Sequence, residues 1–434
     1  MKKIKILVIS NTAWSYDNSF GMTYSALFEG MPDITIANIY CNYGVPDNSC
    51  VKQYFQITEK SIIKNLKDKN SPSGAAFSAE NAARAAISLN KQDGNIHNNL
   101  KKIRFQLVMW GRDIIWFFSR WKSPALKKFV TDFAPDVIFT PVYYMFHTNR
   151  ILRYVRELTK VPTLCYISDD IYTMKQFSYS PLFWIDRILK RKSIRGAVKN
   201  CRCIYTVCDA QSEEYSKAFK VPCKILFKPA DGERYISRKN ECSEKPMQTH
   251  RKKVFVYAGN LGTDRWRTLA AVGREVSLRK GVLKVYSATA VSRRIRKIFL
   301  KSGIEFMGKV SPEEAARARI EADVLVFAEG FSKKAFGKTR FSLSTKIPDY
   351  LTSGKTVLAA GCKGIASIEY LRNENAAIIA DSLDAIGECV EFCMRAKKQY
   401  SKNAMFCAER DFNRKTIQKN LRHDIELATF GEGV

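Results

Sequence analysis

Short β-branched runs alternate with helical stretches along most of this 434-residue chain. Lys5 to Ser10 predicts a buried first strand of a parallel sheet, and Ile34 to Tyr40 predicts a second strand. The alternation continues over 136–227, begins again at Val254 and runs to Ile379. Such alternation is typical of a doubly wound parallel sheet, so the sequence predicts an α/β protein of two Rossmann-like domains that face across a cleft.

Length and a polar stretch predict where the domains divide. A chain this long suits two domains of about 200 residues rather than one core. Residues 229–252 contain few apolar positions and predict a linker. We therefore expect an N-terminal domain over 1–228, the linker over 229–252, a C-terminal domain over 253–400, and a helical segment over 401–434. A return of this last segment to the N-terminal domain is one option.

Two stretches of the N-terminal half break the regular pattern. Residues 42–95 are polar and predict irregular structure, apart from a helix over 79–89. Residues 101–128 mix aromatic side chains, including Trp110, Trp116 and Trp121, with many Lys and Arg residues. This mixture suits a helix in a membrane interface, with its apolar face down and its cations toward the headgroups. The alternative is a core helix with a solvated face.

The charge balance bears on partners. The chain carries 72 Lys and Arg against 42 Asp and Glu, a net charge of +30. Such an excess attracts nucleic acid, anionic lipid or phosphorylated substrates. No nucleic-acid-binding motif occurs and the charge is spread over both halves, so nucleic acid is not an expected partner. One basic run would meet phosphate headgroups, or form a solvated helix face instead: Arg187, Lys190, Arg191, Lys192, Arg195 and Lys199.

The cysteines and the apolar runs of the sequence bear on metal binding and on location in the cell. The twelve cysteines form no CxxC pair and several lie in apolar runs, which indicates core thiols in a reducing compartment and no metal site. The first apolar run is too short for a signal peptide, and no stretch of about eighteen apolar residues could cross a bilayer. We expect a cytoplasmic protein, with the inner face of the cell membrane as a further place of action.

Three segments are candidates for phosphate binding. The loop Ser15 to Gly21 ends at a glycine that opens a helix, where backbone N–H groups can hold an anion. The turn Gly259 to Arg265, which includes Asn260, follows a strand; its glycines allow close approach of a phosphate, and Arg265 adds a cation. The alternative for each segment is an ordinary turn.

The densest candidate is 340–355. Ser344 and Thr345 precede a short helix that begins at Lys346, so hydroxyls, a cation and a positive helix end converge, as a pyrophosphate requires. Asp349 lies one turn beyond Thr345 and could accept a hydrogen bond from a ribose hydroxyl. The alternative is a capped helix with a solvated Lys and Asp.

These segments resemble the retaining GT-B glycosyltransferases of the fourth sequence family. Residues 344–359 look like that family's S-K-x-x-E-Y-L-A-x-G-K-P-V-x-A segment, and 259–265 look like its G-x-L-x-x-x-K turn with Arg265 in place of Lys. Residues 306–314 and 322–326 look like that family's F-x-G-x-V-x-x-E-E and A-D-V-x-V elements, and looser likenesses lie at 229–235, 135–138, 161–170 and 203–214.

The resemblance implies that the N-terminal domain, 1–228, binds the acceptor and that the C-terminal domain, 253–400, binds the nucleotide-sugar donor. It also implies a set of donor contacts. Ser344, Thr345, Lys346 and Arg265 would hold the donor diphosphate, with Gly259 and Asn260 in the same phosphate turn. Asp349 would bind the ribose, Lys309 and Val310 would lie by the base, and Gly21 would close over a phosphate. Neither a metal nor another cofactor is implied, because these cations supply the positive charge.

The sequence also departs from the family. The family often has a glutamate eight positions before the one that Asp349 replaces, but Phe341 stands there; Glu329 resembles the first half of that motif, about a dozen residues early. The expected N-terminal histidine is replaced by Phe139-Thr140-Pro141, with His147 nearby. The candidates for catalysis are therefore Asp169, Asp170, His147 and Glu329.

The expected function is transfer of a sugar, of hexosyltransferase type and with retention, from a nucleotide-sugar donor to a lipid-linked or polysaccharide acceptor. The setting would be bacterial surface-polysaccharide assembly, with an anionic membrane surface as a further candidate partner. Two alternatives remain: a nucleotide-sugar epimerase on the same fold, and a non-catalytic or polyanion-binding relative. The missing glutamate and histidine support the second.

Overall fold

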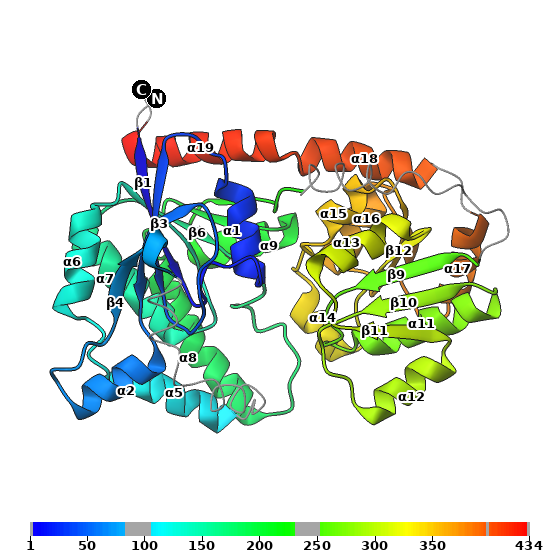
Figure 1. Cartoon of the computed structure of the whole chain (residues 1–434), viewed down its shortest axis with the longest axis horizontal. Coiled ribbons are helices and arrows are strands. Elements are labelled where there is room, and N and C mark those ends of the chain that lie inside the picture. The colour runs from blue at the N-terminus through cyan, green and yellow to red at the C-terminus, as the bar shows by residue number, and fades with distance from the viewer. Residues whose placement is uncertain (1–2, 83–105, 231–251, 396–398, 432–434) are drawn as a thin grey trace. The chain divides into compact units, whose positions relative to one another are not determined.

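The computed structural model describes residues 3–82, 106–230, 252–395 and 399–431 (Figure 1). The chain forms two compact units. Unit 1 comprises Met1–Met174, Ser178–Leu226 and Lys415–Val434, and unit 2 comprises Lys175–Phe177 and Phe227–Arg414. Most of the expected linker, 231–251, lies outside the described residues.

Unit 1 is built on an eight-stranded sheet in the order β4-β3-β2-β1-β5-β6-β7-β8, parallel except for β4. Its strands are β1 (Ile4–Ser10), β2 (Ile34–Tyr40), β3 (Val51–Gln56), β4 (Ala75–Ser78), β5 (Val137–Pro141), β6 (Thr163–Tyr166), β7 (Cys203–Thr206) and β8 (Cys223–Ile225). All of β1 except Lys5 is buried, as expected for a central strand covered on both faces.

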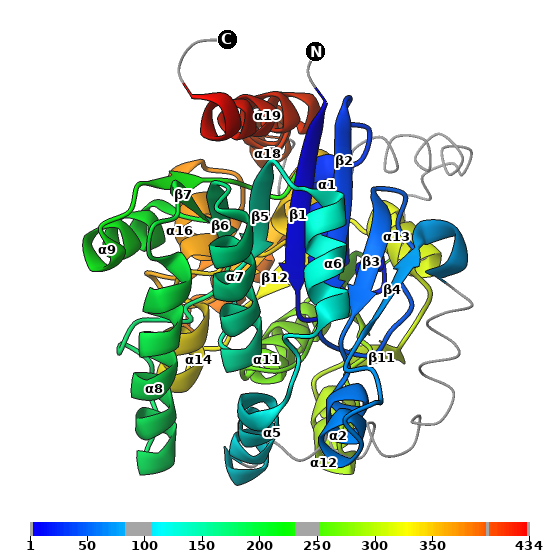
Figure 2. The same cartoon turned by 90° about the vertical axis from the view of Figure 1, so that its left-hand side faces the viewer.

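Helices cover both faces of this sheet. They are α1 (Ser19–Phe28), α2 (Glu59–Lys67), α5 (Gln106–Phe118), α6 (Pro124–Phe133), α7 (Phe146–Thr159), α8 (Pro181–Val198) and α9 (Asp209–Phe219). Helices α6 and α7 lie on one face, and α1 lies on the other (Figures 1 and 2). Aromatic side chains pack α1 against the sheet: the rings of Tyr24 and Phe28 both contact the ring of Phe139 on β5.

The prediction of irregular structure over 42–95 is wrong for its described part, because β3, α2 and β4 lie there. Polar residues interrupt β3, yet Tyr54 and Phe55 are buried, and the buried amide of Gln56 donates to Asn42 O. Long-range pairing thus overrode local polarity. Of the helix expected over 79–89, the described start forms a 3-10 turn, Ala79–Asn81, and residues 83–89 lie outside the described part.

The aromatic and basic stretch 101–128 is not a single helix in its described part. Helix α5 ends at Phe118, and α6 begins at Pro124 after Ser123, whose hydroxyl accepts from Leu126 N. Serine at the cap followed by proline is a strong start signal for a new helix, and this splits the stretch. Residues 101–105 lie outside the described part.

Unit 2 is built on a six-stranded parallel sheet in the order β11-β10-β9-β12-β13-β14. Its strands are β9 (Val254–Ala258), β10 (Val282–Tyr286), β11 (Ile304–Gly308), β12 (Val324–Ala328), β13 (Thr356–Ala360) and β14 (Ile378–Ala380). Its helices are α11 (Arg265–Leu278), α12 (Arg293–Lys301), α13 (Pro312–Glu321), α14 (Lys333–Thr339), α15 (Ile347–Thr352), α16 (Ala366–Asn373), α17 (Ile386–Arg395) and α18 (Gln399–Asp411).

The last helix, α19 (Arg414–Phe430), packs within unit 1. Its Leu421 and Ile425 are fully buried. Asp424 accepts from Tyr205 OH on β7 at 2.8 Å and pairs with Lys224 on β8 at 2.5 Å. Helix α19 is therefore part of the core of unit 1, although it follows unit 2 in the sequence. No helix of the described ranges is long and apolar enough to span a membrane.

Candidate functional site

An ion pair stands at the carboxyl ends of β9 and β12 in unit 2. Glu329 directly follows β12 and is 1% exposed, while Arg265 is the first residue of α11. Arg265 Nε and Nη2 donate to the two carboxylate oxygens of Glu329 at 2.9 and 2.8 Å. This bidentate geometry fixes the guanidinium plane at the edge of the sheet where parallel α/β sheets bind ligands.

The ammonium of Lys346 belongs to the same cluster. Its Nζ lies 4.7 Å from the centre of the Tyr257 ring on β9. The pKa of Lys346 is lowered to about 7, mainly by burial and also by the nearby positive charge of Arg265, while the carboxylate of Glu329 acts in the opposite direction. A lysine held in this way takes up a proton readily when an anion arrives.

The turn between β9 and α11 is tightly shaped. Tyr257 OH donates to Asn260 O at 2.6 Å, and Asn260 Oδ1 accepts from Gly262 N at 2.5 Å. Thr263 and Asp264 both have left-handed backbone angles, with φ of 53° and 61°. The side chain of Asn260 is therefore used to hold the turn, so a role for this residue toward a donor would be through the backbone.

Segment 330–332 closes against this turn. A Cβ on Gly330 would stand 2.2 Å from Thr263 O, so only glycine fits there. Ser332 Oγ donates to Asp264 Oδ2 at 2.5 Å and also caps α14. The extra residues after Glu329 thus form helix α14, which was not expected from the sequence.

The segment before α15 brings the other expected donor residues to the same region of unit 2. Ser344 N donates to Ser367 Oγ at 3.0 Å, and Ser344 Oγ accepts from Lys346 N at 3.4 Å. Thr345 is exposed. Lys228 lies across from it, with Nζ 3.4 Å from Thr345 O and 3.7 Å from Asp349 Oδ2.

Lys228 was missed by the sequence analysis. It lies in the stretch that follows β8, far along the chain from Asp349, and no local motif marks it. Its side chain is mostly buried, and it neutralises the carboxylate expected to bind a ribose. Lys309 and Val310 follow β11, at the same edge of the sheet but two strands from β9; Lys309 is exposed.

Gly21 in unit 1 has a packing reason for being glycine. A Cβ there would stand 2.0 Å from Ser15 O, so the loop that begins at Ser15 lies directly on the start of α1. Gly21 N donates to Asn18 Oδ1 at 2.9 Å. This backbone N–H is thus used by the helix cap.

The two aspartates after β6 differ in exposure. Asp169 is exposed at the carboxyl end of the strand. Asp170 is 4% exposed, and its Oδ1 accepts from the backbone N–H groups of Tyr172 and Thr173 and from Arg187 Nη2 at 3.1 Å. Asp170 therefore stabilises its own loop, whereas the side chain of Asp169 faces solvent.

His147 is buried near the carboxyl end of β1. Its Nε2 is 3.0 Å from Asn11 Oδ1, and its ring stacks on Trp116 with centroids 4.4 Å apart. Burial lowers the pKa of His147 to about 3, and the positive charges of Arg112 and Lys190 act in the same direction. The ring is neutral at physiological pH, so its basicity is too low for an efficient general base.

The basic run on α8 does not offer all its cations to headgroups. Arg187 and Lys190 are buried, and Lys190 pairs with Asp186 at 3.1 Å and with Asp113 at 3.5 Å. Arg191 and Arg195 both contact Tyr172. That expectation is therefore wrong for Arg187 and Lys190, because buried charges require partners inside the protein.

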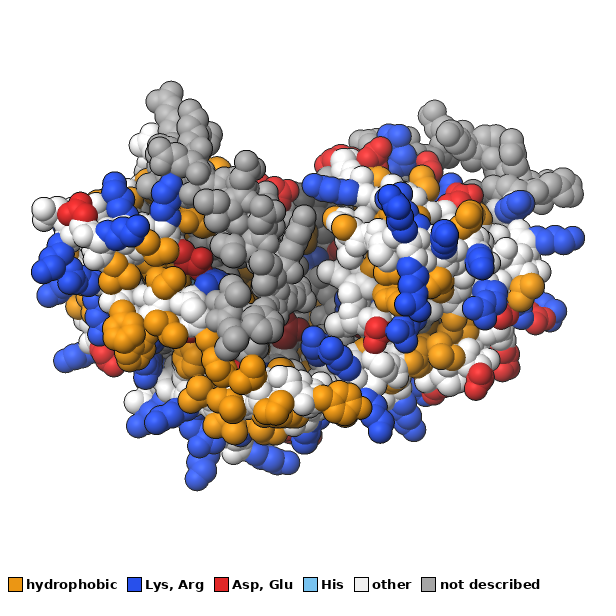
Figure 3. Space-filling model, turned by 90° about the horizontal axis from the view of Figure 1, so that it is seen from below, with side chains coloured by type: hydrophobic (Ala, Val, Ile, Leu, Met, Phe, Trp, Pro, Cys, Tyr) orange, Lys and Arg blue, Asp and Glu red, His pale blue; other side chains and the backbone are white. Residues whose placement is uncertain are grey.

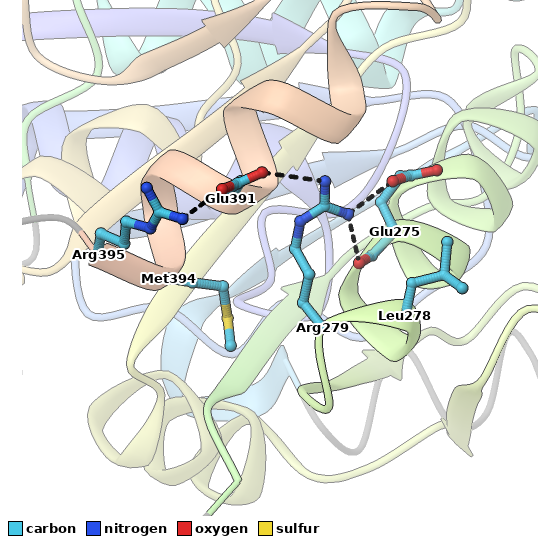
Figure 4. Close-up of a pocket in the computed structure, with 6 residues that line it drawn as sticks. All are labelled: Glu275, Leu278, Arg279, Glu391, Met394 and Arg395. Atoms are coloured by element: carbon cyan, nitrogen blue, oxygen red, sulfur yellow. Dashed lines mark hydrogen bonds and ion pairs between the residues drawn. The ribbon is translucent and has the colours of Figure 1, made fainter.

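A hollow elsewhere in unit 2 is not part of this cluster. It has a volume of about 550 Å³ and lies between the end of α11 and α17 (Figure 4). Arg279 bridges Glu275 and Glu391 within it. Since Arg265 begins α11 and this hollow lies at the other end of that helix, the two sites are separate.

Neither a protein-family model nor a curated protein sequence matches this chain. Solved structures do. A sucrose-phosphate synthase from Thermosynechococcus elongatus has a TM-score of 0.64 at 12% identity, over 97% of this chain and 98% of that one. A UDP-forming trehalose-phosphate synthase from Burkholderia xenovorans, in complex with glucose-6-phosphate, has a TM-score of 0.61 at 9% identity, over 97% and 100%.

An enzyme of another kind shares the same fold. A UDP-GlcNAc 2-epimerase from Neisseria meningitidis, bound to UDP-GlcNAc, has a TM-score of 0.51 at 10% identity, over 97% of this chain and 99% of that one. Likenesses at such low identity bear on fold alone. Together with the two parallel sheets, they show that the chain has the GT-B fold of two Rossmann-like domains.

Proposed function

We propose that this protein is a glycosyltransferase that takes a hexose from a nucleotide-diphosphate sugar. One observation carries the proposal: the cations of Arg265 and Lys346 meet at the carboxyl ends of β9 and β12, beside the buried carboxylate of Glu329. Two cations at that edge of a Rossmann-like sheet suit a diphosphate.

The donor would lie along this edge of unit 2. Lys346 and Arg265 would contact the diphosphate together with the hydroxyls of Ser344 and Thr345. Asp349, held by Lys228, would accept from the ribose, and Lys309 and Val310 would flank the base. The fixed cations stabilise the negative charge that develops on the diphosphate as the bond to the anomeric carbon breaks. They make a metal ion unnecessary in the proposed mechanism.

The acceptor hydroxyl would attack the anomeric carbon as the bond from that carbon to the diphosphate breaks, and the hydroxyl proton would pass to the oxygen of the departing diphosphate. Asp169 is the exposed carboxylate at a strand end in unit 1 and is our candidate for contact with the acceptor. Retention of anomeric configuration and membership of the fourth sequence family rest on the motif resemblance at 344–359 and 259–265. Nuclear magnetic resonance of the product would read the configuration directly.

The net charge of +30 supports a lipid-linked or polysaccharide acceptor with anionic surroundings, as in bacterial surface-polysaccharide synthesis. Such a protein would work in the cytoplasm at the inner face of the membrane. Incubation with a radiolabelled nucleotide sugar and lipid extracts, followed by extraction into organic solvent, would identify a lipid-linked product.

Calorimetry tests the donor site. UDP, GDP and ADP are titrated into the wild type, Lys346→Ala and the control Lys301→Ala, whose exposed lysine ends α12. We expect one nucleotide to bind with a micromolar Kd, with about tenfold or greater weakening in Lys346→Ala, as for loss of one charge-assisted contact, and with no change in the control. No binding by any nucleotide would remove the donor-site assignment.

A nucleotide-sugar epimerase is the second candidate. It is favoured by a lysine of pKa about 7 at this edge of the sheet, because Lys346 could donate or accept a proton near neutral pH. An epimerase would convert its nucleotide sugar without any acceptor. Proton resonances of the sugar, followed over time with the protein alone, distinguish the two: a new epimer supports the second candidate.

A further inference from the structure

In helix α5 of unit 1, charged side chains face the protein interior and several large apolar side chains face solvent. Its Asp113 faces the buried Lys190 of α8 at 3.5 Å, and its Trp110 Nε1 donates to Asp186 of α8 at 2.9 Å. In contrast, Ile114, Phe117 and Phe118 are 57%, 63% and 68% exposed. Trp116 packs inward. A helix on a water-facing surface normally has the opposite arrangement.

The first half of α8 repeats this inversion. Arg187 and Lys190 are 2% and 3% exposed, whereas Ile188 and Leu189, their neighbours in sequence, are 58% and 50% exposed. The buried cations are held by Asp170, Asp186 and Asp113. Burying a charged side chain costs free energy unless the charge is fully paired, and exposing apolar side chains lowers solubility. A helix that only had to face water would therefore not have this arrangement.

Polar contacts join α5 to its two neighbours. Arg112 Nε pairs with Glu59 at the start of α2 at 2.5 Å, while Asp113 and Trp110 contact α8. The outward apolar residues of the three helices form a surface that we name the three-helix face: Ile63, Leu66, Ile114, Phe117, Phe118, Ile185, Ile188 and Leu189. The view from below in Figure 3 shows hydrophobic side chains gathered on this side of the molecule, with Lys and Arg around them.

The exposed charged residues within the three helices are cations, and the exposed Asp68 lies just beyond the end of α2. Each helix has one acidic residue in its described sequence, and all three are paired with a cation: Glu59 with Arg112, and Asp113 and Asp186 with Lys190. Lys64, Lys67 and Lys192 are exposed. An apolar surface bordered by cations matches the boundary between the acyl chains and headgroups of an anionic bilayer.

We propose that the three-helix face binds an anionic lipid surface, with Phe117 and Phe118 inserted below the headgroups. A second copy of the chain is the poorer occupant, because two faces bordered by lysines, on chains of charge +30, repel each other. Helices α2 and α8 follow β3 and β6, so the face lies toward the carboxyl ends of the sheet of unit 1. A lipid-linked acceptor would reach that end from the membrane.

Vesicle flotation with the full chain tests this proposal without any sugar transfer, so its failure is separable from failure of the proposed function. The vesicles are phosphatidylcholine alone, or with about a third phosphatidylglycerol. The variant is Phe117→Ser with Phe118→Ser, and the matched control is Phe392→Ser with Phe406→Ser, two phenylalanines of unit 2 that are 50% and 63% exposed.

We expect binding only to the anionic vesicles, a decrease of about tenfold or more in the double variant, and no decrease in the control. A second variant, Lys64→Glu with Lys192→Glu, should also lose binding, and salt should weaken the wild type. Absence of binding to anionic vesicles would overturn the proposal. So would equal binding by the phenylalanine variant, or a wild-type dimer in sedimentation that this variant converts to monomer.

Discussion

The ammonium of Lys346 lies against the α-carbon of Gly259: a Cβ on residue 259 would stand 1.7 Å from Lys346 Nζ. The glycine of the turn and the lysine of the segment before α15 are therefore one structural unit, although 87 positions separate them (346 − 259). In the sequence, the two segments are separate candidates for phosphate binding, and only the family resemblance places Lys346 and Arg265 on one diphosphate. In the structure, the absence of a side chain at Gly259 makes room for the ammonium of Lys346.

Gly259→Ala should therefore weaken nucleotide binding by displacing the ammonium. The loss should approach that of Lys346→Ala, about tenfold or more, because the same contact to phosphate is removed. Gly111→Ala in α5, where a Cβ would meet nothing within 4 Å, is the matched control and should bind as the wild type does. Calorimetry on the wild type, Gly259→Ala, Lys346→Ala and Gly111→Ala measures this. Wild-type affinity in Gly259→Ala would show that Lys346 does not act from this position.

Nucleotide binding should depend on pH through Lys346. Its pKa of about 7 in the free protein must rise when an anionic diphosphate binds, so binding takes up protons and affinity falls as pH rises from 7 to about 9. Titrations at pH 8 in buffers of different ionisation enthalpy would reveal the uptake. In Lys346→Met the dependence over this range should disappear; if it persists, another group is responsible.

The same lysine predicts how stability responds to pH. In the unfolded chain its pKa is that of an ordinary lysine, so between that value and about 7 the unfolded state binds more protons than the folded state. The free energy of unfolding should therefore rise with pH from 7 toward 10, to the extent that Lys346 contributes. Denaturant titrations of wild type and Lys346→Met should converge at high pH and differ most near neutrality.

Glu329→Gln should destabilise unit 2 by about 2 kcal/mol, since the guanidinium of Arg265 loses a charged, bidentate partner at a buried position. Glu275→Gln is the matched control. Its pair with Arg279 is about a quarter exposed on each side, and such a pair contributes less than about 1 kcal/mol. Urea unfolding measures both. Equal costs would mean that the Arg265–Glu329 pair has no special stabilising role.

His147 should make unit 1 sensitive to acid. Its pKa is about 3 in the folded protein, so below its ordinary value of about 6.5 the unfolded state binds the extra proton and stability falls with pH. His147→Gln should lose less stability between pH 7 and pH 5 than the wild type does. Thermal unfolding at both pH values measures this, with exposed His423→Gln as the control. An unchanged pH dependence in His147→Gln would contradict this assignment.

Helix α19 should be required for the stability of unit 1. Ile425→Ala removes a fully buried side chain and should cost about 2–4 kcal/mol, whereas Leu427→Ala on the same helix, 38% exposed, should cost less than about 1 kcal/mol. Urea unfolding followed by tryptophan fluorescence reports mainly on unit 1, because five of the six tryptophans, including the buried Trp14 and Trp121, lie in that unit. Similar costs for the two variants would show that α19 does not pack as described.

Most of the strands could be predicted from the sequence, and the physical reason is burial on both faces. A strand such as Val324–Ala328 must be apolar at every position, so its run is visible without any partner. β3 was missed because it carries exposed Lys52 and Gln53, and only pairing with β2 and β4 explains it. Helix α14 was missed for a similar reason, since its lysines and glycine give little helical pattern.

The sequence by itself determined the α/β class and the short helix that follows Lys346, because both depend on local patterns of apolar residues and helix-start residues. Only the tertiary structure decided which charges are available. Arg265 and Glu329 are 64 positions apart, and Asp113 and Lys190 are 77 apart (190 − 113), yet each pair is in contact. Whether a Lys or Arg faces solvent, a ligand or a buried carboxylate depends on partners that folding brings together, because an ion loses its hydration only where an opposite charge replaces it.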